Sequence, residues 1–385
     1  MTTWFRRAAA WAIAATLAVL AAGPLSAQGV TSAAVSGRVT QAGGQPVEGA
    51  TVIIINTSTG QRFQIQTRAG GRYSLENVPP GGPYTISARG VGFQPNNLSG
   101  VQLNLGQRFT HDFELTQAVV QVQELTINAA VDPLINKGRT GAASTISDSA
   151  IANLPTISRN FTDFVVTSPQ VVATPNGGPS IGGSNNRFNN IQVDGGVNND
   201  LFGLGASGVP GGQVSARPVP LDAVKEFQVL VSPFDVRQGG FTGGLVNAIT
   251  KSGTNDFHWD AWLSLQNQGL VGNDSSGKGA NTFSTTMFGG SISGPIVKNK
   301  AQFFVSADIQ KKTLPYAGAL LNAGKNGDAL AVADTLAARY PALTAGSPGT
   351  FNENNPGTNI FAKVTAQAGQ NGQIEFSDNY GKTTD

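Results

Sequence analysis

Residues 257–266 read FHWDAWLSLQ, and this stretch decides the fold because its side chains alternate between apolar and polar types. Successive side chains of a β-strand point to opposite faces, so the alternation gives the strand one apolar face and one polar face. The apolar face carries Phe257, Trp259, Ala261, Leu263 and Leu265. The other face carries His258, Asp260, Ser264 and Gln266, with Trp262 as the exception. The stretch therefore predicts a strand that lies between an apolar and a polar environment.

The same alternation recurs twice downstream. In residues 301–310 the odd-numbered positions are apolar and Phe304 is the exception, and residues 360–367 repeat the pattern. A β-sandwich would turn such apolar side chains into a shared core, whereas a membrane barrel turns them outward to lipid. The alternation alone does not choose between these two folds.

The lengths of the connections favour the barrel. The expected connections are a long polar loop (267–281), a tight turn (295–300), a much longer loop from Ile309 to about Asn359, and a short turn (369–372). Long outer loops and short periplasmic turns are typical of outer-membrane barrels. Helical spacing of apolar residues in 328–340 also predicts a helix within the longest loop.

The number of strands predicts an incomplete barrel. Strands and turns of ordinary length give only about five strands between residues 255 and 385, whereas plugged outer-membrane transporters have about 22. An open sheet edge leaves backbone groups unpaired in lipid. We therefore expect the 385 residues to be part of a longer chain.

Residues 140–254 predict an α+β domain. Ser147 is suited to cap a short helix over 148–154 that Pro155 ends. The other expected elements are a helical stretch at 159–167, Gly-rich loops at 177–190 and 202–212, a strand at 191–193, a helix start at 221–227, and strands at 228–231 and 245–250. The Gly-rich loops match no phosphate-binding motif, and we expect them at the ligand-facing end of the domain.

Four motifs in this region carry a family resemblance. They are LP with SRNF (154–155, 158–161), QVDGG with NND (192–196, 198–200), PLDAVKEF (220–227) and GGLVNAITKSGTN (243–255). The region resembles the plug domain of TonB-dependent receptors, in the Oar-like branch, although TSPQV (167–171) stands where the family more often has a Pro-Gly pair. Residues 289–304 likewise resemble the first barrel hairpin of that branch.

Residues 35–113 predict a small β-sandwich, because short β-prone runs alternate with Gly and Pro turns. The expected strands are 35–40, 50–55, 62–67, 72–75 and 84–88, with Phe63 and Ile65 on one face. The runs SGRV (36–39), QPVEGATV (45–52), GRYSL (71–75) and VPPG (78–81) resemble the carboxypeptidase regulatory-like domain. The resemblance implies a prealbumin-like sandwich and no peptidase activity.

The segment between these two regions, residues 117–139, contains the extended run VVQVQELTINA (119–129). A lone β-prone strand has unpaired backbone groups and is suited to addition to the sheet edge of a partner. The family resemblance then makes Glu124, Leu125, Thr126, Ile127 and Asn128 the candidate TonB box. The alternative interpretation is the last strand of the preceding sandwich, or a plain linker.

The N-terminus predicts export. Arg6 and Arg7 precede an apolar run from Ala8 to Ala22, and a small residue, Ala27, stands at the expected cut. This pattern indicates a signal peptide over residues 1–27, and the alternative is an uncleaved inner-membrane anchor. The net charge of +2 is too small to argue for nucleic acid. A charged share of 12% with 49 glycines suits a barrel with a polar interior.

Candidate metal and catalytic groups are weak. His111 and Glu114 have the spacing of a zinc motif, but residues three apart on a strand face opposite sides. Asp194, Asn198 and Asp200 lack the spacing of a calcium loop and are better explained as turn caps. We therefore expect that the protein binds no cofactor and no metal and that it is not an enzyme.

Together these features predict a mainly β chain in five parts: a signal peptide (1–27), a carboxypeptidase regulatory-like β-sandwich (33–116), a linker (117–139), an α+β plug (140–254) and the first strands of a transmembrane barrel (255–385). The resemblances imply TonB-dependent uptake of an unidentified extracellular ligand through the outer membrane, with the N-terminal domains in the periplasm and with TonB and outer-membrane lipid as partners. The alternative is surface adhesion or carbohydrate binding. A soluble periplasmic binding protein conflicts with lipid-facing strands.

Overall fold

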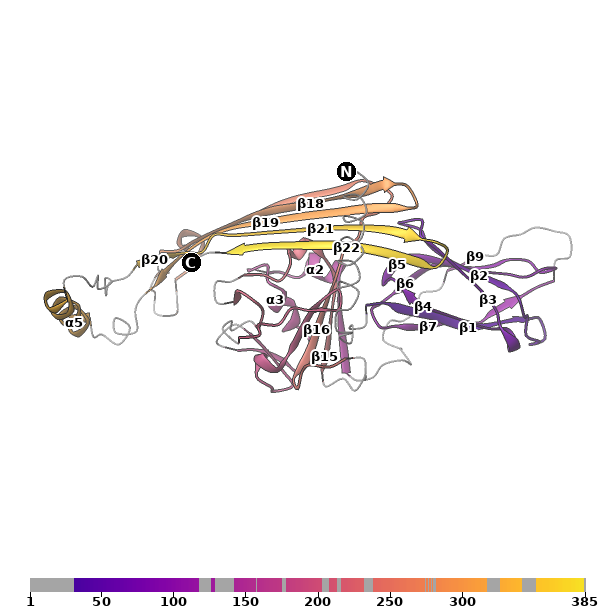
Figure 1. The fold of residues 1–385 in the computed structure, drawn as a ribbon, viewed down its shortest axis with the longest axis horizontal. Coiled ribbons are helices and arrows are strands. Elements are labelled where there is room, and N and C mark those ends of the chain that lie inside the picture. Colours follow the sequence, from indigo (N-terminus) through magenta and orange to yellow (C-terminus); the bar gives the residue numbers. More distant parts are fainter. Residues whose placement is uncertain are drawn as a thin grey trace, which may run out of the picture.

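The computed structural model describes residues 31–117, 126–128 and 142–383, apart from short gaps at 157, 175–177, 203–207, 213–215, 232–237, 274, 276, 278, 280–281, 317–325 and 341–350. The predicted signal peptide lies outside these residues. The described part is mainly β and has three bodies, which we call the module (31–117 and 126–128), the plug (142–254) and the wall (258–383). Figure 1 shows the wall as long strands that cover the plug, with the module beside both. Among the described residues, no helix is long and apolar enough to cross a membrane.

The module is the predicted β-sandwich. One sheet has the order β4-β1-β7, with β8 also pairing with β1, and the other has the order β3-β2-β5-β6-β9. Its strands are β1 (Ala33–Gln41), β2 (Thr51–Asn56), β3 (Arg62–Gln66), β4 (Arg72–Val78), β5 (Gly81–Arg89), β6 (Asn96–Leu103), β7 (Arg108–Thr110), β8 (Phe113–Leu115) and β9 (Thr126–Asn128), with the 3-10 turn η1 (Ala69–Gly71). The core between the sheets includes Val35, Ile54, Phe63, Tyr84 and Phe113.

The alternating run at residues 108–115 is two strands and not one. β7 pairs with Ala34–Ser36 and β8 pairs with Val39–Gln41, so the chain bends at His111 and Asp112 between them. The bend brings the carbonyl oxygen of His111 against Gly37, where any Cβ atom would clash with it. Glycine is therefore required at position 37 for this crossing of β1.

The plug has the sheet order β10-β15-β16-β13-β14 and a separate β11–β12 hairpin. Its strands are β10 (Ala142–Ser147), β11 (Val171–Ala173), β12 (Pro179–Ile181), β13 (Asn190–Val193), β14 (Gly196–Val197), β15 (Val224–Val231) and β16 (Gly244–Thr250). Its helices are α2 (Asp148–Asn153), α3 (Phe161–Val165), η2 (Asn186–Phe188) and η4 (Leu221–Ala223). As predicted, Ser147 caps α2, since its hydroxyl accepts the N–H of Ala150 at 3.4 Å.

Two predictions within the plug were wrong. The expected helix start at 221–227 is only the single turn η4, and strand β15 already begins at Val224. Pairing explains the difference, because β15 lies between β10 and β16 and is almost wholly buried. The Gly-rich loop at 177–190 also contains β12, which pairs with β11.

The wall is an antiparallel sheet of the order β17-β18-β19-β21-β22, with β20 also pairing with β19. Its elements are β17 (His258–Asn267), η5 (Gln268–Leu270), β18 (Ser284–Val297), β19 (Ala301–Tyr316), α5 (Asn326–Arg339), β20 (Phe351–Asn354), β21 (Gly357–Ala368) and β22 (Gly372–Thr383). The tight turns at 298–300 and 369–371 and the helix in the longest loop agree with the prediction. β19 continues to Tyr316, past the expected end at Ile309, because its far end pairs with β20.

The faces of the wall are those expected of a barrel. The predicted apolar face is exposed at Trp259, Leu263 and Val364, which keep 78%, 64% and 40% of their full accessible area. The polar face covers the plug. The two exceptions to the alternation now have a reason, since Phe304 is buried in the plug core and Trp262 contacts plug side chains.

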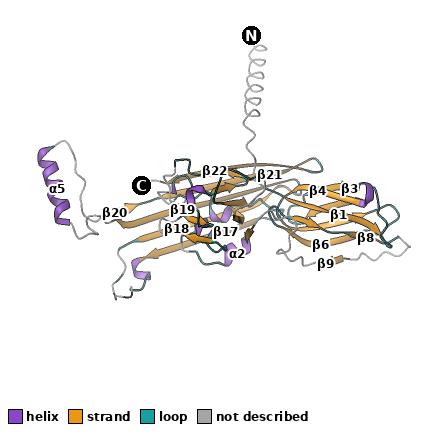
Figure 2. Ribbon diagram, turned by 90° about the horizontal axis from the view of Figure 1, so that it is seen from below, coloured by secondary structure: helices purple, strands orange, loops and turns teal. Residues whose placement is uncertain are grey.

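The module lies at the short-turn end of the wall, whereas α5 lies at the opposite end (Figures 1 and 2). Gln64 N–H donates to Asn371 Oδ1 at 2.8 Å, and Gln302 Nε2 donates to the Thr59 carbonyl at 3.0 Å. The β2–β3 hairpin of the module therefore contacts the short-turn end of the wall.

Candidate functional site

Three of the five residues of the candidate TonB box are placed. Thr126, Ile127 and Asn128 form β9, which runs parallel to β6 opposite Asn97, Leu98 and Ser99. Glu124 and Leu125 lie outside the described residues. β9 is the last strand of its sheet, as the alternative interpretation anticipated. Its role in binding a partner stays a prediction.

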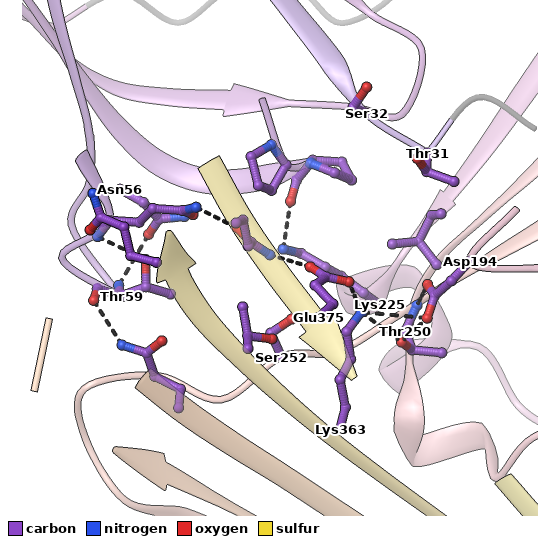
Figure 3. A pocket seen from close by; sticks show the side chains of 18 of the residues that line it. Thr31, Ser32, Asn56, Thr59, Asp194, Lys225, Thr250, Ser252, Lys363 and Glu375 are labelled. Carbon is purple, nitrogen blue, oxygen red and sulfur yellow. Dashed lines mark hydrogen bonds and ion pairs between the residues drawn. The ribbon is translucent and has the colours of Figure 1, made fainter. Parts of the chain in front are cut away.

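A polar cavity of about 300 Å³ lies where the module, the plug and the wall meet. Figure 3 shows Asn56 and Thr59 from the module, Lys225 and Thr250 from the plug, and Lys363 from the wall around it. All three bodies contribute charged or amide side chains. The cavity is therefore a junction at the short-turn end of the wall, and a change in the position of any body would alter it.

Lys363 of β21 is the centre of the junction. Its ammonium lies 2.8 Å from Glu375 Oε2, 3.1 Å from Thr250 Oγ1 and 3.4 Å from Asp194 Oδ2, and its side chain is 3% exposed. Asp194 also accepts the N–H of Thr250 at 2.8 Å through Oδ1. The turn between β13 and β14 and the end of β16 are thus bonded to the wall through one lysine.

Strand β15 of the plug holds the module. Lys225 Nζ donates to the carbonyl of Pro80 at 2.7 Å, and Glu226 Oε1 accepts the N–H of Leu105 at 2.8 Å. Gln228 Nε2 donates to the Leu105 carbonyl at 2.8 Å. Burial raises the pKa of Glu226 and lowers the pKa of Lys225, in both cases against the charged form. The contact is therefore defined by specific hydrogen bonds, but the burial of Lys225 and Glu226 has a desolvation cost in free energy.

One further ion pair and one cation–π contact join the plug to the wall. Arg217 and Asp308 form an ion pair of 3.3 Å with side chains 8% and 2% exposed. Arg159 forms an ion pair of 2.7 Å with Asp222, and its guanidinium lies 3.6 Å from the centre of the Trp262 ring. Together with Lys363 these contacts hold the plug on the polar face of the wall.

The sequence pointed to some of these residues but not to their partners. Asp194, Asp222, Lys225 and Glu226 lie in the motifs that resemble the plug family. Arg217, Asp308, Lys363 and Glu375 were missed. Their only local signal is a charge on the polar face of a strand, or in a loop, and the partners lie far away in sequence.

The structure gives each of the weak metal candidates its own local contacts. The ring of His111 meets the ring of Phe113 edge-on with centroids 4.7 Å apart, and burial lowers the pKa of His111. Glu114 is exposed on β8. Asp194 bonds to Thr250, and Asp200 Oδ1 accepts the N–H of Phe202 at 3.0 Å, as turn caps do.

The aromatic side chains of the module bear on the carbohydrate-binding alternative. Phe63, Tyr73, Tyr84, Phe109 and Phe113 are all in its core, and Phe93 packs against that core. Within the described part of the module, no exposed aromatic side chain is left to form a platform for a sugar ring. The structure therefore does not favour that alternative.

Two family models match the chain, one over the module and one over the wall. The family model of the carboxypeptidase regulatory-like domain matches residues 34–116, and that of an outer membrane beta barrel domain matches residues 249–377. The TonB-dependent transporter Oar of Myxococcus xanthus is 28% identical over 273 residues, which are 65% of this chain and 24% of that protein. The chain thus spans 24% of the length of this curated relative.

Two solved structures are similar in part. The siderophore receptor PirA of Acinetobacter baumannii has 20% identity and a TM-score of 0.45, over 63% of this chain and 31% of that one. The outer membrane transporter YddB of Escherichia coli has 14% identity and a TM-score of 0.43, over 63% and 33%. The chain thus carries a carboxypeptidase regulatory-like domain and an outer membrane beta barrel domain, which makes it an outer-membrane protein with its N-terminal domain in the periplasm, and it is similar to the TonB-dependent transporter Oar over 65% of its length.

Proposed function

We propose that the protein imports an extracellular ligand across the outer membrane, with TonB pulling on the segment that contains Glu124–Asn128. The observation that carries the proposal is the way the plug is held. It occupies the polar face of the wall and is bonded there through buried charges, chiefly Lys363 and Arg217. A ligand can pass through the barrel only if this plug moves. The proposed role includes no chemical step.

The connecting segment is suited to start that movement. It leads into β10, the edge strand of the plug sheet, in which only Ile146 is buried. β10 is held by its pairing with β15, from Ala142 opposite Val231 to Ser147 opposite Glu226. Force applied on the N-terminal side of β10 first reaches an edge strand that has a single buried residue, so the plug would begin to open there.

The binding step is strand addition. A partner strand supplies main-chain hydrogen bonds to an extended segment, and alternate side chains give specificity. β9 lies at the end of its sheet, next to β6, and its other edge is not paired with any described strand. TonB can therefore either add to that edge or take the segment from β6, and both routes use the residues of the candidate box.

The test uses the full-length gene product in cells that contain TonB. Residues 124–128 are deleted in one strain, and residues 42–45, a turn of the module, are deleted in a control strain. Radiolabelled siderophores, vitamins and oligosaccharides are screened for binding and for uptake. We expect the 124–128 deletion to retain binding of the cognate ligand and to lose its uptake, whereas the control retains both. Uptake that persists without residues 124–128 would exclude this segment as the TonB box.

A direct binding measurement is independent of the ligand. A peptide of residues 118–135 is titrated with the periplasmic domain of TonB, and a scrambled peptide of the same composition is the control. We expect saturable binding of the native peptide alone. Equal binding of both peptides would contradict recognition of a strand.

A further inference from the structure

The outer face of the β4-β1-β7 sheet of the module carries a cluster of arginines. Arg38, Arg68, Arg72 and Arg108 line an open hollow of about 630 Å³, and Asp112 is the one acidic residue in its lining. The hollow lies on the sheet that does not carry β9. It is therefore separate from the candidate TonB box.

The arginines are neighbours in the sheet. Arg38 of β1 lies directly opposite Arg72 of β4 in the antiparallel register, and Arg68 is bridged to Arg72 across the η1 turn. Like charges directly opposite one another on a sheet are destabilising. The arrangement therefore reduces stability unless an anion lies between the guanidinium groups.

The nearby acidic groups neutralise this cluster only in part, since Asp112 and Glu76 supply two negative charges against four arginines. Asp112 Oδ1 accepts the backbone N–H of Arg38 at 2.7 Å, and Glu76 forms an exposed ion pair of 3.1 Å with Arg108. The guanidinium groups of Arg38, Arg68 and Arg72 form no ion pair with a described acidic residue. Three adjacent cations thus have their donors available.

Protection of a sheet edge does not explain the cluster. Charged side chains on edge strands prevent unwanted pairing, and that reason applies to Arg72 on β4. It does not apply to Arg38, because β1 is the central strand of its sheet. Hydroxyl groups follow next along the same face, where Ser36 lies opposite Ser74 and bonds to Thr110.

We propose that this hollow, which we call the arginine hollow, binds a multivalent oxyanion, a group with two or more phosphate or carboxylate charges. The planar guanidinium fork pairs with either group through two parallel hydrogen bonds. Arg38 and Arg72 hold the anion from two adjacent strands, and Arg68 closes one side. The bound charge removes the repulsion between the arginines, so binding stabilises the module.

The test uses the full-length protein in detergent, titrated with inorganic pyrophosphate and, separately, with citrate, at constant ionic strength in sodium chloride. The variant is Arg38→Gln with Arg72→Gln. The control is Arg62→Gln with Arg89→Gln, which removes the same charge from the opposite sheet of the sandwich. We expect saturable binding to the wild type that is weakened about tenfold or more in the variant and is unchanged in the control.

Each outcome decides the proposal. Binding of pyrophosphate alone identifies a phosphate site, binding of citrate alone a carboxylate site, and binding of both a general oxyanion site. Absence of saturable binding of either anion, or equal weakening in variant and control, overturns the proposal. Thermal unfolding gives a second criterion: without anion the variant should be at least as stable as the wild type, and with anion it should lack the stabilisation. A variant that is less stable without anion would show that the arginines are structural.

Discussion

Arg217 of the plug and Asp308 of β19 form a buried ion pair between two bodies of the protein, 91 residues apart in sequence. The second nitrogen of Arg217 donates to Gln310 Oε1 at 2.7 Å, so the guanidinium is bonded to two residues of one strand. Removal of one partner of such a pair leaves an uncompensated buried charge. The contact therefore joins the plug to β19 while it is intact, and the loss of one charged partner destabilises that junction.

The first prediction concerns this pair. Asp308→Asn keeps the shape of the side chain and removes its charge, which leaves Arg217 buried without a counter-ion. We expect a loss of roughly 3–5 kcal/mol in the free energy of unfolding of the plug, measured by denaturant titration with proteolysis of the plug as the readout. Asp334→Asn, on the exposed face of α5, is the matched control and should change nothing. Wild-type resistance to protease in Asp308→Asn would contradict a holding role for the pair.

The second prediction concerns Asp194, whose backbone is left-handed with φ of 47°. Asp194→Asn tolerates this backbone and still accepts the Thr250 N–H but loses the attraction to Lys363, so we expect a cost of about 1–3 kcal/mol. Asp194→Ala loses the hydrogen bonds as well and adds a left-handed penalty of about 1–2 kcal/mol. The free energy of unfolding should thus fall in the order wild type, Asn, Ala. Equal values for the two variants would show that neither the backbone nor the retained hydrogen bond matters.

The third prediction concerns pH and Glu226. Because burial raises its pKa in the folded protein, the unfolded chain loses this proton first as the pH rises. The stabilisation that Glu226 contributes is fully present below the ordinary glutamate pKa of roughly 4.3. It is lost as the pH rises through the folded pKa. Glu226→Gln does not titrate, so its stability relative to the wild type should increase across this interval and then stay constant.

The measurement for Glu226 is the difference in unfolding midpoint between variant and wild type, taken from acid to neutral pH. Glu114→Gln, on the exposed surface of β8, is the control. A difference that does not change with pH, or one that decreases as the pH rises, would mean that desolvation is not the dominant effect at this contact.

The fourth prediction concerns the lipid face of the wall. Leu263→Arg places a charge on the outward face of β17, where Leu263 is 64% exposed. A charge on the lipid face of a barrel costs about 2–4 kcal/mol near the middle of the membrane. We expect a smaller folded fraction of the full-length protein, seen as heat-modifiable migration on a gel. Leu263→Phe keeps the position apolar and should fold like the wild type. Equal folded fractions for both variants would contradict a lipid-facing wall.

Several elements show which parts of the fold the local sequence predicts. The alternation at 257–266 and 301–310 predicted the strands β17 and β19, because the two faces of a strand meet different surroundings. The end of β19 was placed too early, since its far end depends on pairing with β20 and not on its own pattern. The start of β15 was missed for the same reason, because two neighbouring strands bury residues that have helical spacing.

The sequence by itself determined the alternation of the long wall strands, their tight turns, the cap of α2, and the order of the three bodies, because these depend on neighbouring residues and on motifs within one segment. Only the tertiary structure decided which charges meet. Lys363 and Asp194 are 169 residues apart, and Arg38 faces Arg72 only through the register of β1 and β4. An ion pair needs two groups within a few ångströms of one another. That distance is set by the packing of plug on wall and of strand on strand, and not by anything local to either residue.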